Sequence, residues 1–294
     1  MRITGGQVFD LERGFVSRDV CASGLLITEA SGDDTVLDAS GCYVMPGLVD
    51  VHFHGGVGED FSDGTPAGLQ KIAAFELAQG VTYICPTGMT LPEDQLTAIC
   101  ENTAAHQKRD SGGAEVVGAH LEGPFLCMAK KGAQNGDYLH DPDVSMLKRL
   151  QEAAGGCVRL VTLAPEQPGS IEFIKAAAEM GIHVSVGHTV ANYETAKAAF
   201  EAGADHATHL YNAMPPLAHR DPGVIGAAYE VPHVKAELIC DGIHIHPSVV
   251  RLTFSLFGKE RMIIISDSLR ATGMPDGEYP FGGQMIEVHG NRAT

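Results

Sequence analysis

The sequence predicts an α/β fold, a (β/α)8 barrel of the TIM type preceded by a small β-rich segment. After Pro46, short apolar runs typical of strands recur eight times, and Ala-rich helical patterns lie between several of them. Alternation of strands and helices is typical of a parallel sheet closed into a barrel. Residues 1–45 instead show no helical period and consist of short β-type pieces separated by turns.

The two parts of this pattern suggest two domains, residues 1–47 and residues 48–294. The first contains the pieces MRITGGQVFD, GLLITEA, TVLDAS and CYVMPG, which we interpret as a small antiparallel unit. In the second, strands are expected in eight runs: 48–54, 81–86, 115–120, 157–163, 182–187, 205–209, 234–240 and 262–267. Helices are expected at 67–80, 170–181 and 193–203, each with a glycine near its end as a C-cap.

The last segment departs from the barrel pattern. Residues 276–294 are typical of turns and a β-hairpin, and no helical pattern follows the eighth strand. We therefore expect an open barrel with the C-terminal part of the fold missing, and an exposed apolar flank. A polypeptide that ends at Thr294 is expected to be poorly stable, and the natural product is expected to continue beyond it.

Composition limits the classes of partner. The chain has 294 residues, 44% of them hydrophobic, and 20 basic against 37 acidic residues give a formal net charge of -17. Such a charge argues against nucleic acid or an anionic membrane as a partner. The N-terminus lacks the apolar region of a secretory signal, and no run approaches the roughly 18 apolar residues of a membrane span. Seven scattered cysteines without a C-x-x-C pair predict reduced thiols in a cytoplasmic protein.

Polar residues stand at the ends of several predicted strands. They are His52, His54, Glu122, His188, His209 and Asp267. The carboxyl ends of barrel strands meet at one rim, so these side chains are expected to lie together. Imidazoles and carboxylates there predict a divalent metal site with an open position, and an adjacent aspartate predicts a base that activates water. The pattern favours a metal-dependent hydrolase.

Each of these residues has a plainer interpretation. An isolated H-x-H motif is as often one solvated and one core histidine, Glu122 alone fits a surface loop, and Asp267 could cap a turn. Their common rim favours the metal site. His183 and His206 lie further back in their strands and are interpreted as structural.

Further polar residues lie on loops after the third, sixth and seventh strands. They are Lys130, Lys131, Asn212, His219, Arg220 and His244. Barrel loops of this kind commonly bind phosphate, and arginine does so in a bidentate manner.

Together these motifs resemble a known family. PGLVDVHFHG, HLEGPF, KKGAQN, LAPE, GHT, THLYNAMPPLAHRDPG, CDGIHIHP and SDS are similar to those of the N-acetylglucosamine-6-phosphate deacetylases of the amidohydrolase superfamily. The resemblance runs along the whole chain. It implies hydrolysis of an acetyl amide to acetate and glucosamine 6-phosphate, in a barrel that carries a small β-sandwich domain to which residues 1–47 contribute.

The resemblance also implies roles for individual residues. Glu122, His188 and His209 match the principal metal ligands, and His52 and His54 match a second metal position found in some members. Asp267 matches the catalytic aspartate. Asn212, Ala213, Arg220 and His244 match the sugar-phosphate contacts, with Arg220 reaching the neighbouring site of a homodimer. Gln134, placed among the substrate-binding residues, stands where some members carry a histidine that polarises the acetyl carbonyl.

Several alternatives stay open at this point. The metal is zinc or iron, with one or two ions per subunit, because imidazole and carboxylate suit both metals and several of their neighbours. The substrate could be the galactosamine epimer, or the chain could be another amidohydrolase. A non-catalytic sugar-phosphate-binding protein is a further alternative, although such a role would not require Glu122, His188, His209 and Asp267 together.

Overall fold

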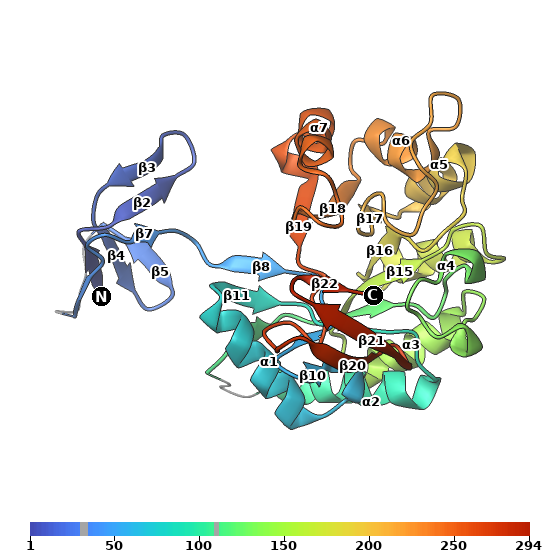
Figure 1. Cartoon of the computed structure of the whole chain (residues 1–294), viewed down its shortest axis with the longest axis horizontal. Helices are drawn as coiled ribbons and strands as arrows, with labels where there is room; N and C mark the ends of the chain where they lie inside the picture. Colours follow the sequence, from blue (N-terminus) through green and yellow to red (C-terminus); the bar gives the residue numbers. More distant parts are fainter. Residues whose placement is uncertain (30–34, 109–111) are drawn as a thin grey trace. The chain divides into compact units, whose positions relative to one another are not determined.

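The computed structural model describes residues 1–29, 35–108 and 112–294 (Figure 1). These residues form two compact units, Met1–Leu48 and Val49–Thr294. In the part of the chain that the structure describes, no helix is both long and apolar enough to cross a membrane.

The N-terminal unit consists of two small sheets with the strand orders β5-β4-β1-β6 and β3-β2-β7. Its strands are β1 (Arg2–Thr4), β2 (Gln7–Asp10), β3 (Gly14–Ser17), β4 (Val20–Ser23), β5 (Leu26–Thr28), β6 (Val36–Asp38) and β7 (Tyr43–Val44). The prediction of a purely antiparallel unit is wrong, because β6 runs parallel to β1 and β7 parallel to β2. A tight turn can only reverse the chain, whereas the longer connections to β6 and β7 allow a parallel return.

The second unit contains the predicted barrel strands. They are β8 (Leu48–Asp50, which begins at the boundary), β11 (Val81–Ile84), β12 (Thr87–Gly88), β13 (Glu115–Val116), β14 (Ala119–Glu122), β15 (Val158–Leu163), β16 (His183–Val186), β17 (His206–Ala207), β18 (Lys235–Ile239) and β19 (Met262–Ile265). They form parallel ladders in the orders β13-β11-β8 and β12-β14-β15-β16-β17-β18-β19. A short antiparallel pair, β9 (Gly55–Gly56) and β10 (Glu59–Asp60), follows the first barrel strand. The predicted α/β barrel architecture is confirmed.

Helices cover the outer side of these strands (Figure 1). They are α1 (Pro66–Ala78), α2 (Glu93–His106), α3 (Val144–Ala153), α4 (Ser170–Glu179), α5 (Tyr193–Ala202), α6 (Gly223–Glu230) and α7 (Pro247–Phe257). The three helices expected from the sequence are found as α1, α4 and α5. Helix α5 illustrates the local signals: the side chain of Asn192 accepts a hydrogen bond from the N–H of Thr195, and Gly203 ends the helix at a φ of 124°. Its buried face is Ala196, Ala199 and Phe200.

Isolated backbone hydrogen bonds link the two barrel sheets at the carboxyl ends of their strands. The N–H of Thr87 donates to the carbonyl of Phe53 (2.8 Å), which links the second strand to the residues after the first. On the other side, the N–H of Asp267 donates to the carbonyl of His52 (3.0 Å), which links the eighth strand to the first. Among the described strands, however, no ladder joins β19 to β8, so the barrel is open in its strand pairing on this side, as expected. The expected uncovered flank is also present, because Ile264 on β19 is 57% exposed and no helix occurs in residues 266–294, all of which the structure describes.

The segment predicted to form a hairpin lies against the barrel loops. It forms β20 (Gly277–Phe281), β21 (Gln284–His289) and a short third strand, β22 (Arg292–Ala293). At the tip, Gly282 has a φ of 58°, and a Cβ atom there would lie 2.3 Å from the carbonyl oxygen of Ala133. Only glycine fits this approach. The hairpin tip is thereby packed beside the loop that follows β14.

Candidate metal centre and active site

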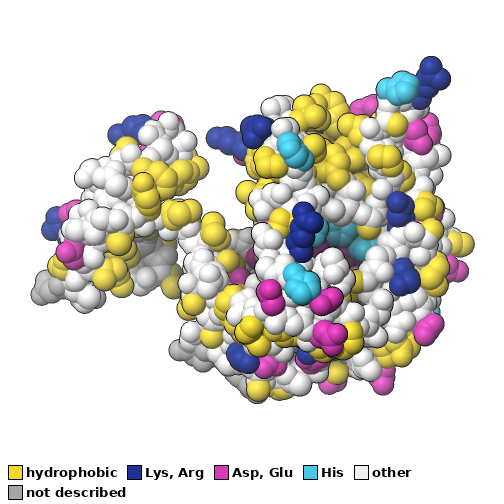
Figure 2. All heavy atoms as spheres, in the orientation of Figure 1, with side chains coloured by type: hydrophobic (Ala, Val, Ile, Leu, Met, Phe, Trp, Pro, Cys, Tyr) yellow, Lys and Arg dark blue, Asp and Glu magenta, His cyan; other side chains and the backbone are white. Residues whose placement is uncertain are grey.

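The structure brings all six predicted rim residues together. They follow or end β8, β14, β16, β17 and β19, and they are His52, His54, Glu122, His188, His209 and Asp267. Figure 2 shows histidine side chains inside a hollow of the larger unit. The positions beyond β8 are not on a regular strand as predicted. Their backbone groups still alternate between the neighbouring strands, so His52 and His54 point to the same side.

Glu122 and two histidines form a compact triangle of donor atoms. Glu122 Oε1 lies 3.0 Å from His188 Nε2 and 3.2 Å from His209 Nε2, and the two Nε2 atoms are 3.0 Å apart. Ligands at the usual metal–nitrogen and metal–oxygen distances are separated from one another by about 3.3–3.5 Å in a tetrahedral site. The observed spacings are within a few tenths of an ångström of that arrangement. The three side chains therefore fit a divalent cation.

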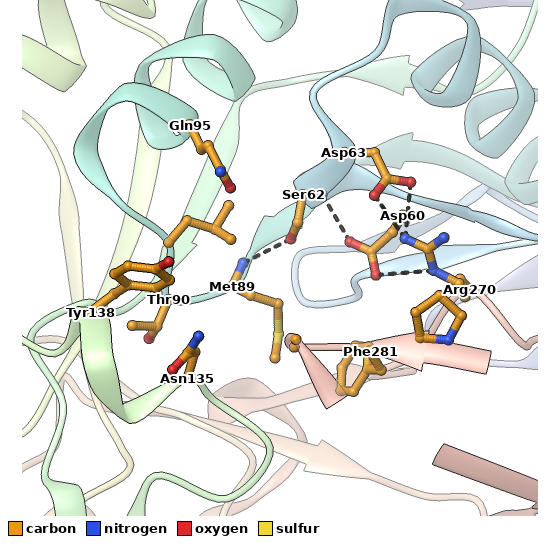
Figure 3. A pocket seen from close by; sticks show the side chains of 14 residues that line it. Asp60, Ser62, Asp63, Met89, Thr90, Gln95, Asn135, Tyr138, Arg270 and Phe281 are labelled. Carbon is orange, nitrogen blue, oxygen red and sulfur yellow. Dashed lines mark hydrogen bonds and ion pairs between the residues drawn. The ribbon is translucent and has the colours of Figure 1, made fainter. Parts of the chain in front are cut away.

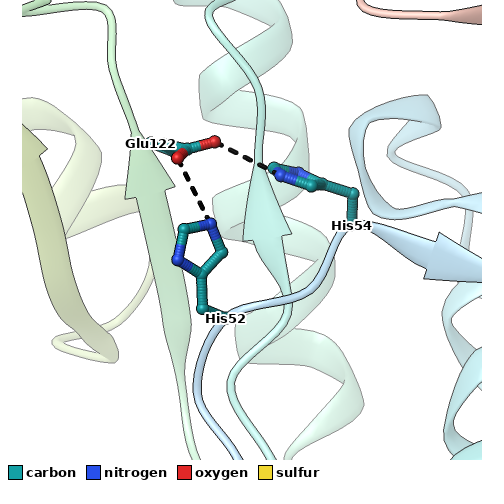
Figure 4. A group of neighbouring side chains, drawn as sticks. All are labelled: His52, His54 and Glu122. Atoms are coloured by element: carbon teal, nitrogen blue, oxygen red, sulfur yellow. Dashed lines mark ion pairs between the residues drawn. The ribbon is translucent and has the colours of Figure 1, made fainter. Parts of the chain in front are cut away.

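A second group of donors shares the same carboxylate (Figure 4). His52 Nε2 lies 3.3 Å from Glu122 Oε1, and His54 Nε2 lies 3.2 Å from Glu122 Oε2. Figure 4 shows both imidazole rings directed at the carboxylate of Glu122, at the end of β14. Glu122 thus belongs to both groups of potential ligands.

Hydrogen bonds on the outer side of the rings determine which nitrogen faces the centre. The Nδ1 atom of His188 donates to the carbonyl of Lys130 (2.8 Å), and the Nδ1 atom of His54 donates to the carbonyl of Thr87 (3.1 Å). A carbonyl can only accept, so the proton of a neutral ring is on Nδ1 and the lone pair of Nε2 points inward. This is the tautomer that ligates a metal through Nε2.

Glu237 is a buried carboxylate beside the candidate centre that the sequence analysis missed. It lies on β18, fully buried, with Oε2 2.8 Å from His52 Nδ1 and 3.2 Å from the N–H of His209. The Nε2 atom of His52 is buried without a hydrogen-bond partner, which leaves it available as a ligand. An acidic residue within the apolar run AELIC was the available signal, because burying a carboxylate is costly unless a partner is present.

Asp267 lies beside the second group. Its Oδ1 is 3.4 Å from His54 Nε2 and 3.7 Å from His52 Nε2. The residue has a φ of 52°, and His188 and His209 also have positive φ values of 47° and 26°. Each such conformation costs on the order of 1–3 kcal/mol for a non-glycine residue and is characteristic of functional sites. The turn at each strand end directs the side chain across the rim.

The carboxylates control the protonation of the histidines. Burial lowers the pKa of His54, but its hydrogen bonds to Asp267 and Glu122 outweigh burial and raise the pKa to about 10. Burial likewise opposes ionisation of Glu122 and Asp267, yet the neighbouring imidazoles hold the pKa of each carboxyl below its usual value. A centre with two ionised carboxylates among histidines attracts positive charge, whether protons or a metal cation.

His120, His183 and His206 lie outside the two donor groups that contain Glu122. His120 is fully buried between two hydroxyls, with Nδ1 3.1 Å from Thr87 Oγ1 and Nε2 2.8 Å from Thr162 Oγ1, and burial holds its pKa well below the ordinary value. His183 and His206, at the amino ends of β16 and β17, each bond Asp205. They lie at the opposite strand ends from the candidate centre.

A cavity of about 220 Å³ opens onto the centre. Of the expected substrate contacts, the residues that line it are Gln134, Asn212, Ala213 and His244. Arg220 is exposed and does not line this cavity. Met89 and Phe281, which sequence reasoning did not single out, form apolar parts of the wall, and the Phe281 ring centroid lies 5.4 Å from that of His54.

A second cavity of about 320 Å³ shares Met89 and Phe281 with the first (Figure 3). Figure 3 shows the guanidinium of Arg270 directed at Asp60 and Asp63. The distances are 2.8 Å to Asp63 Oδ1 and 3.9 Å to Asp60 Oδ2. The cation on this wall is therefore already paired within the protein.

Comparison with known proteins places this geometry in context. The sequence model of the amidohydrolase family matches residues 43–277. The N-acetylglucosamine-6-phosphate deacetylase of Lysinibacillus sphaericus is 39% identical over 252 residues, which cover 86% of this chain and 65% of that protein. The N-acetylgalactosamine-6-phosphate deacetylase of Escherichia coli O157:H7 is 36% identical, with 84% and 65% covered. The chain thus spans about 65% of the length of these relatives.

Solved structures of similar fold also include N-acetylglucosamine-6-phosphate deacetylases. The N-acetyl-D-glucosamine-6-phosphate deacetylase of Mycobacterium smegmatis matches with a TM-score of 0.89 at 32% identity, over 98% of this chain and 76% of that chain. A mutant of the same enzyme, solved in complex with N-acetyl-D-glucosamine-6-phosphate, has a TM-score of 0.87 at 32% identity, over 100% and 77% of the two chains.

Proposed function

The chain belongs to the amidohydrolase family, and we propose that it hydrolyses N-acetylglucosamine 6-phosphate to glucosamine 6-phosphate and acetate. The observation that carries the proposal is the convergence of Glu122, His188, His209 and Asp267 on one cavity at the carboxyl end of the barrel. The chain covers about 65% of the Lysinibacillus sphaericus enzyme, and the activity is therefore a proposal.

Glu122, His188 and His209 would hold a divalent zinc or iron ion, and His52 and His54 with Glu122 would form a second position. When bound, such an ion supplies Lewis acidity, which lowers the pKa of water and polarises a carbonyl. The inward Nε2 lone pairs and the shared carboxylate support this assignment.

Asp267 would act as the general base and then as the general acid. Its carboxylate accepts a proton from the attacking water as the new bond to the acetyl carbon forms. When the carbon–nitrogen bond breaks, Asp267 returns that proton to the leaving nitrogen, which departs as the amine of the sugar, and the acyl group leaves as acetate. Its position on the wall of the cavity that holds the metal-ligand candidates supports this role.

Asn212, Ala213 and His244 would contact the sugar phosphate. They line the cavity, and His244 is oriented by a hydrogen bond from its Nδ1 to Asp241 (2.8 Å). Arg220 would bind the phosphate in the neighbouring subunit of a homodimer. Its exposed side chain, which another subunit could contact, supports this part of the proposal.

A second candidate is the galactosamine epimer of the substrate, favoured by the 36% identity to the N-acetylgalactosamine-6-phosphate deacetylase.

The remaining proposals concern the location of the protein and the assignment of its N-terminal unit. The free thiols of all seven cysteines support a cytoplasmic location. The two small sheets of the N-terminal unit support its assignment to a β-sandwich domain.

The test is acetate release from both epimeric phosphosugars by the purified full-length protein. We expect turnover with added Zn²⁺ or Fe²⁺, abolition after thorough chelation, and recovery when metal is restored. Unphosphorylated N-acetylglucosamine is the control for phosphate recognition. Tight binding of the phosphosugar without acetate release, whichever metal is added, would contradict the proposed deacetylase activity and favour a binding protein.

A further inference from the structure

We propose that Gln134 is a positioning residue that fixes the carboxylate of Glu122, instead of a residue that polarises the substrate carbonyl. This inference rests on the proposed function, since it concerns how the same centre is built. Gln134 is buried, with 2% of its surface exposed, on the loop after β14. Its side chain has one acceptor and two donor sites, and the protein engages both ends of the amide.

The orientation of the amide follows from its partners. The backbone N–H of Thr90 can only donate, and it lies 2.6 Å from one end of the amide, which must therefore be the oxygen Oε1. The other end is then the nitrogen Nε2, which donates to Glu122 Oε2 at 2.7 Å. A hydrogen bond to an ionised acceptor is stronger than one between neutral groups. Gln134 thus connects the loop after β12, which contains Thr90, to the carboxylate.

The carboxylate held in this way is the one that both groups of histidines share. Glu122 Oε1 faces His188 and His209, and rotation of the carboxylate would remove that oxygen from them. The bond from Gln134 fixes Oε2 and thereby the direction of Oε1. Outer hydrogen bonds of this kind typically change metal affinity by about 10–100-fold when they are removed.

The same contacts argue against a role on the substrate carbonyl. Only the second N–H of Gln134 Nε2 could donate to a ligand while the bond to Glu122 is kept, and a full reorientation of the amide would leave the buried N–H of Thr90 without its acceptor. An unsatisfied buried polar group costs about 1–3 kcal/mol. The loop itself is held, because the N–H of Gln134 donates to the carbonyl of Lys131 (3.0 Å) and Lys131 Nζ donates to the carbonyl of Gln134 (3.1 Å).

The experiment replaces the amide by apolar side chains of similar size, Gln134→Leu and Gln134→Met. Gln95→Leu, the same change on the wall of the adjoining cavity, is the control. Metal affinity is measured by competition with a chromophoric chelator, and the coordination geometry is read from the absorption spectrum of the Co²⁺-loaded protein. We expect both Gln134 variants to bind metal about 10–100-fold more weakly with an altered Co²⁺ spectrum, and the control to match the wild type.

Kinetics separate positioning from direct contact. At saturating metal, the Gln134 variants should recover most of kcat with KM nearly unchanged. Wild-type metal affinity and an unchanged Co²⁺ spectrum, together with a kcat at least about 100-fold lower, would overturn the proposal in favour of carbonyl polarisation. If both variants fail to fold, a crystal structure of the metal-loaded wild type with substrate decides: Gln134 Nε2 on Glu122 supports the proposal, and Gln134 Nε2 on the acetyl oxygen overturns it. The metal measurements do not depend on turnover, so they stand even if the deacetylase assignment fails.

Discussion

Replacing Asp267 by asparagine removes the proposed proton acceptor and changes little else. Asparagine is one of the few non-glycine residues that adopt a left-handed conformation readily, so the φ of 52° at this position should be retained. The principal donors, Glu122, His188 and His209, do not include the substituted side chain. Metal should therefore stay bound, and the free energy of unfolding should change by less than about 1 kcal/mol.

The expected loss of rate follows from the surroundings of Asp267. General acid–base catalysis contributes about 10²–10⁴-fold. Glu122 is the other carboxylate that lines the cavity, and both of its oxygens are engaged by histidines and by Gln134, so no second carboxylate there is free to replace Asp267. We therefore expect kcat to fall by about 10³–10⁴-fold, which corresponds to about 4–5.5 kcal/mol of transition-state stabilisation.

The assay is acetate release under saturating substrate, with metal content measured on the same samples. Asp63→Asn is the matched control, since it is the same chemical change in a carboxylate that pairs with Arg270 away from the centre. Turnover of the Asp267→Asn protein within a few-fold of wild type, at equal metal content, would refute the assignment of Asp267 as the base. Loss of bound metal would instead show that Asp267 acts mainly as a ligand.

Two further predictions concern the phosphate and the protons of the centre. Arg220→Ala should raise KM for the phosphosugar by about 10–150-fold, because a charge-assisted hydrogen bond is worth about 1.5–3 kcal/mol, and should leave KM for unphosphorylated N-acetylglucosamine unchanged; equal losses for both would mean that Arg220 does not bind phosphate. The pKa of His54 is raised to about 10, so this ring holds a proton at neutral pH that a metal must displace, and the pKa of His209 is raised in the same direction. Apparent metal affinity should then increase with pH, about tenfold per unit for each proton released, and calorimetry in buffers of different ionisation enthalpy should detect that release; affinity independent of pH between 6 and 8 would contradict it.

The periodicity of the sequence determined the barrel and most of the centre. Strand-forming runs and Ala-rich helices recur with the spacing of a parallel sheet, and the carboxyl ends of parallel strands must lie at one rim. For this reason His52, His54, Glu122, His188, His209 and Asp267 could be grouped before any coordinates were known. The distances between these residues along the sequence did not have to be interpreted, because the barrel topology itself brings the strand ends together.

Contacts between distant side chains could not be predicted in this way. Glu237 lies within β18 and not at its end, and it belongs to no motif. Its placement beside the centre depends on a contact across the barrel, in which Glu237 Oε2 lies 2.8 Å from His52 Nδ1. The backbone hydrogen bonds between the segments that follow β8 and β19 join residues more than two hundred positions apart, which no local pattern encodes.

The orientation of the Gln134 amide likewise could not be predicted from the sequence. The family resemblance placed this residue among the substrate contacts, but its amide could equally have faced the substrate or the protein. The tertiary structure decided between these, because the N–H of Thr90 and the carboxylate of Glu122 reach it from two other segments of the chain and occupy both of its ends. Periodicity determines which face a residue lies on, whereas the partner of a buried polar group depends on which segments the fold packs around it.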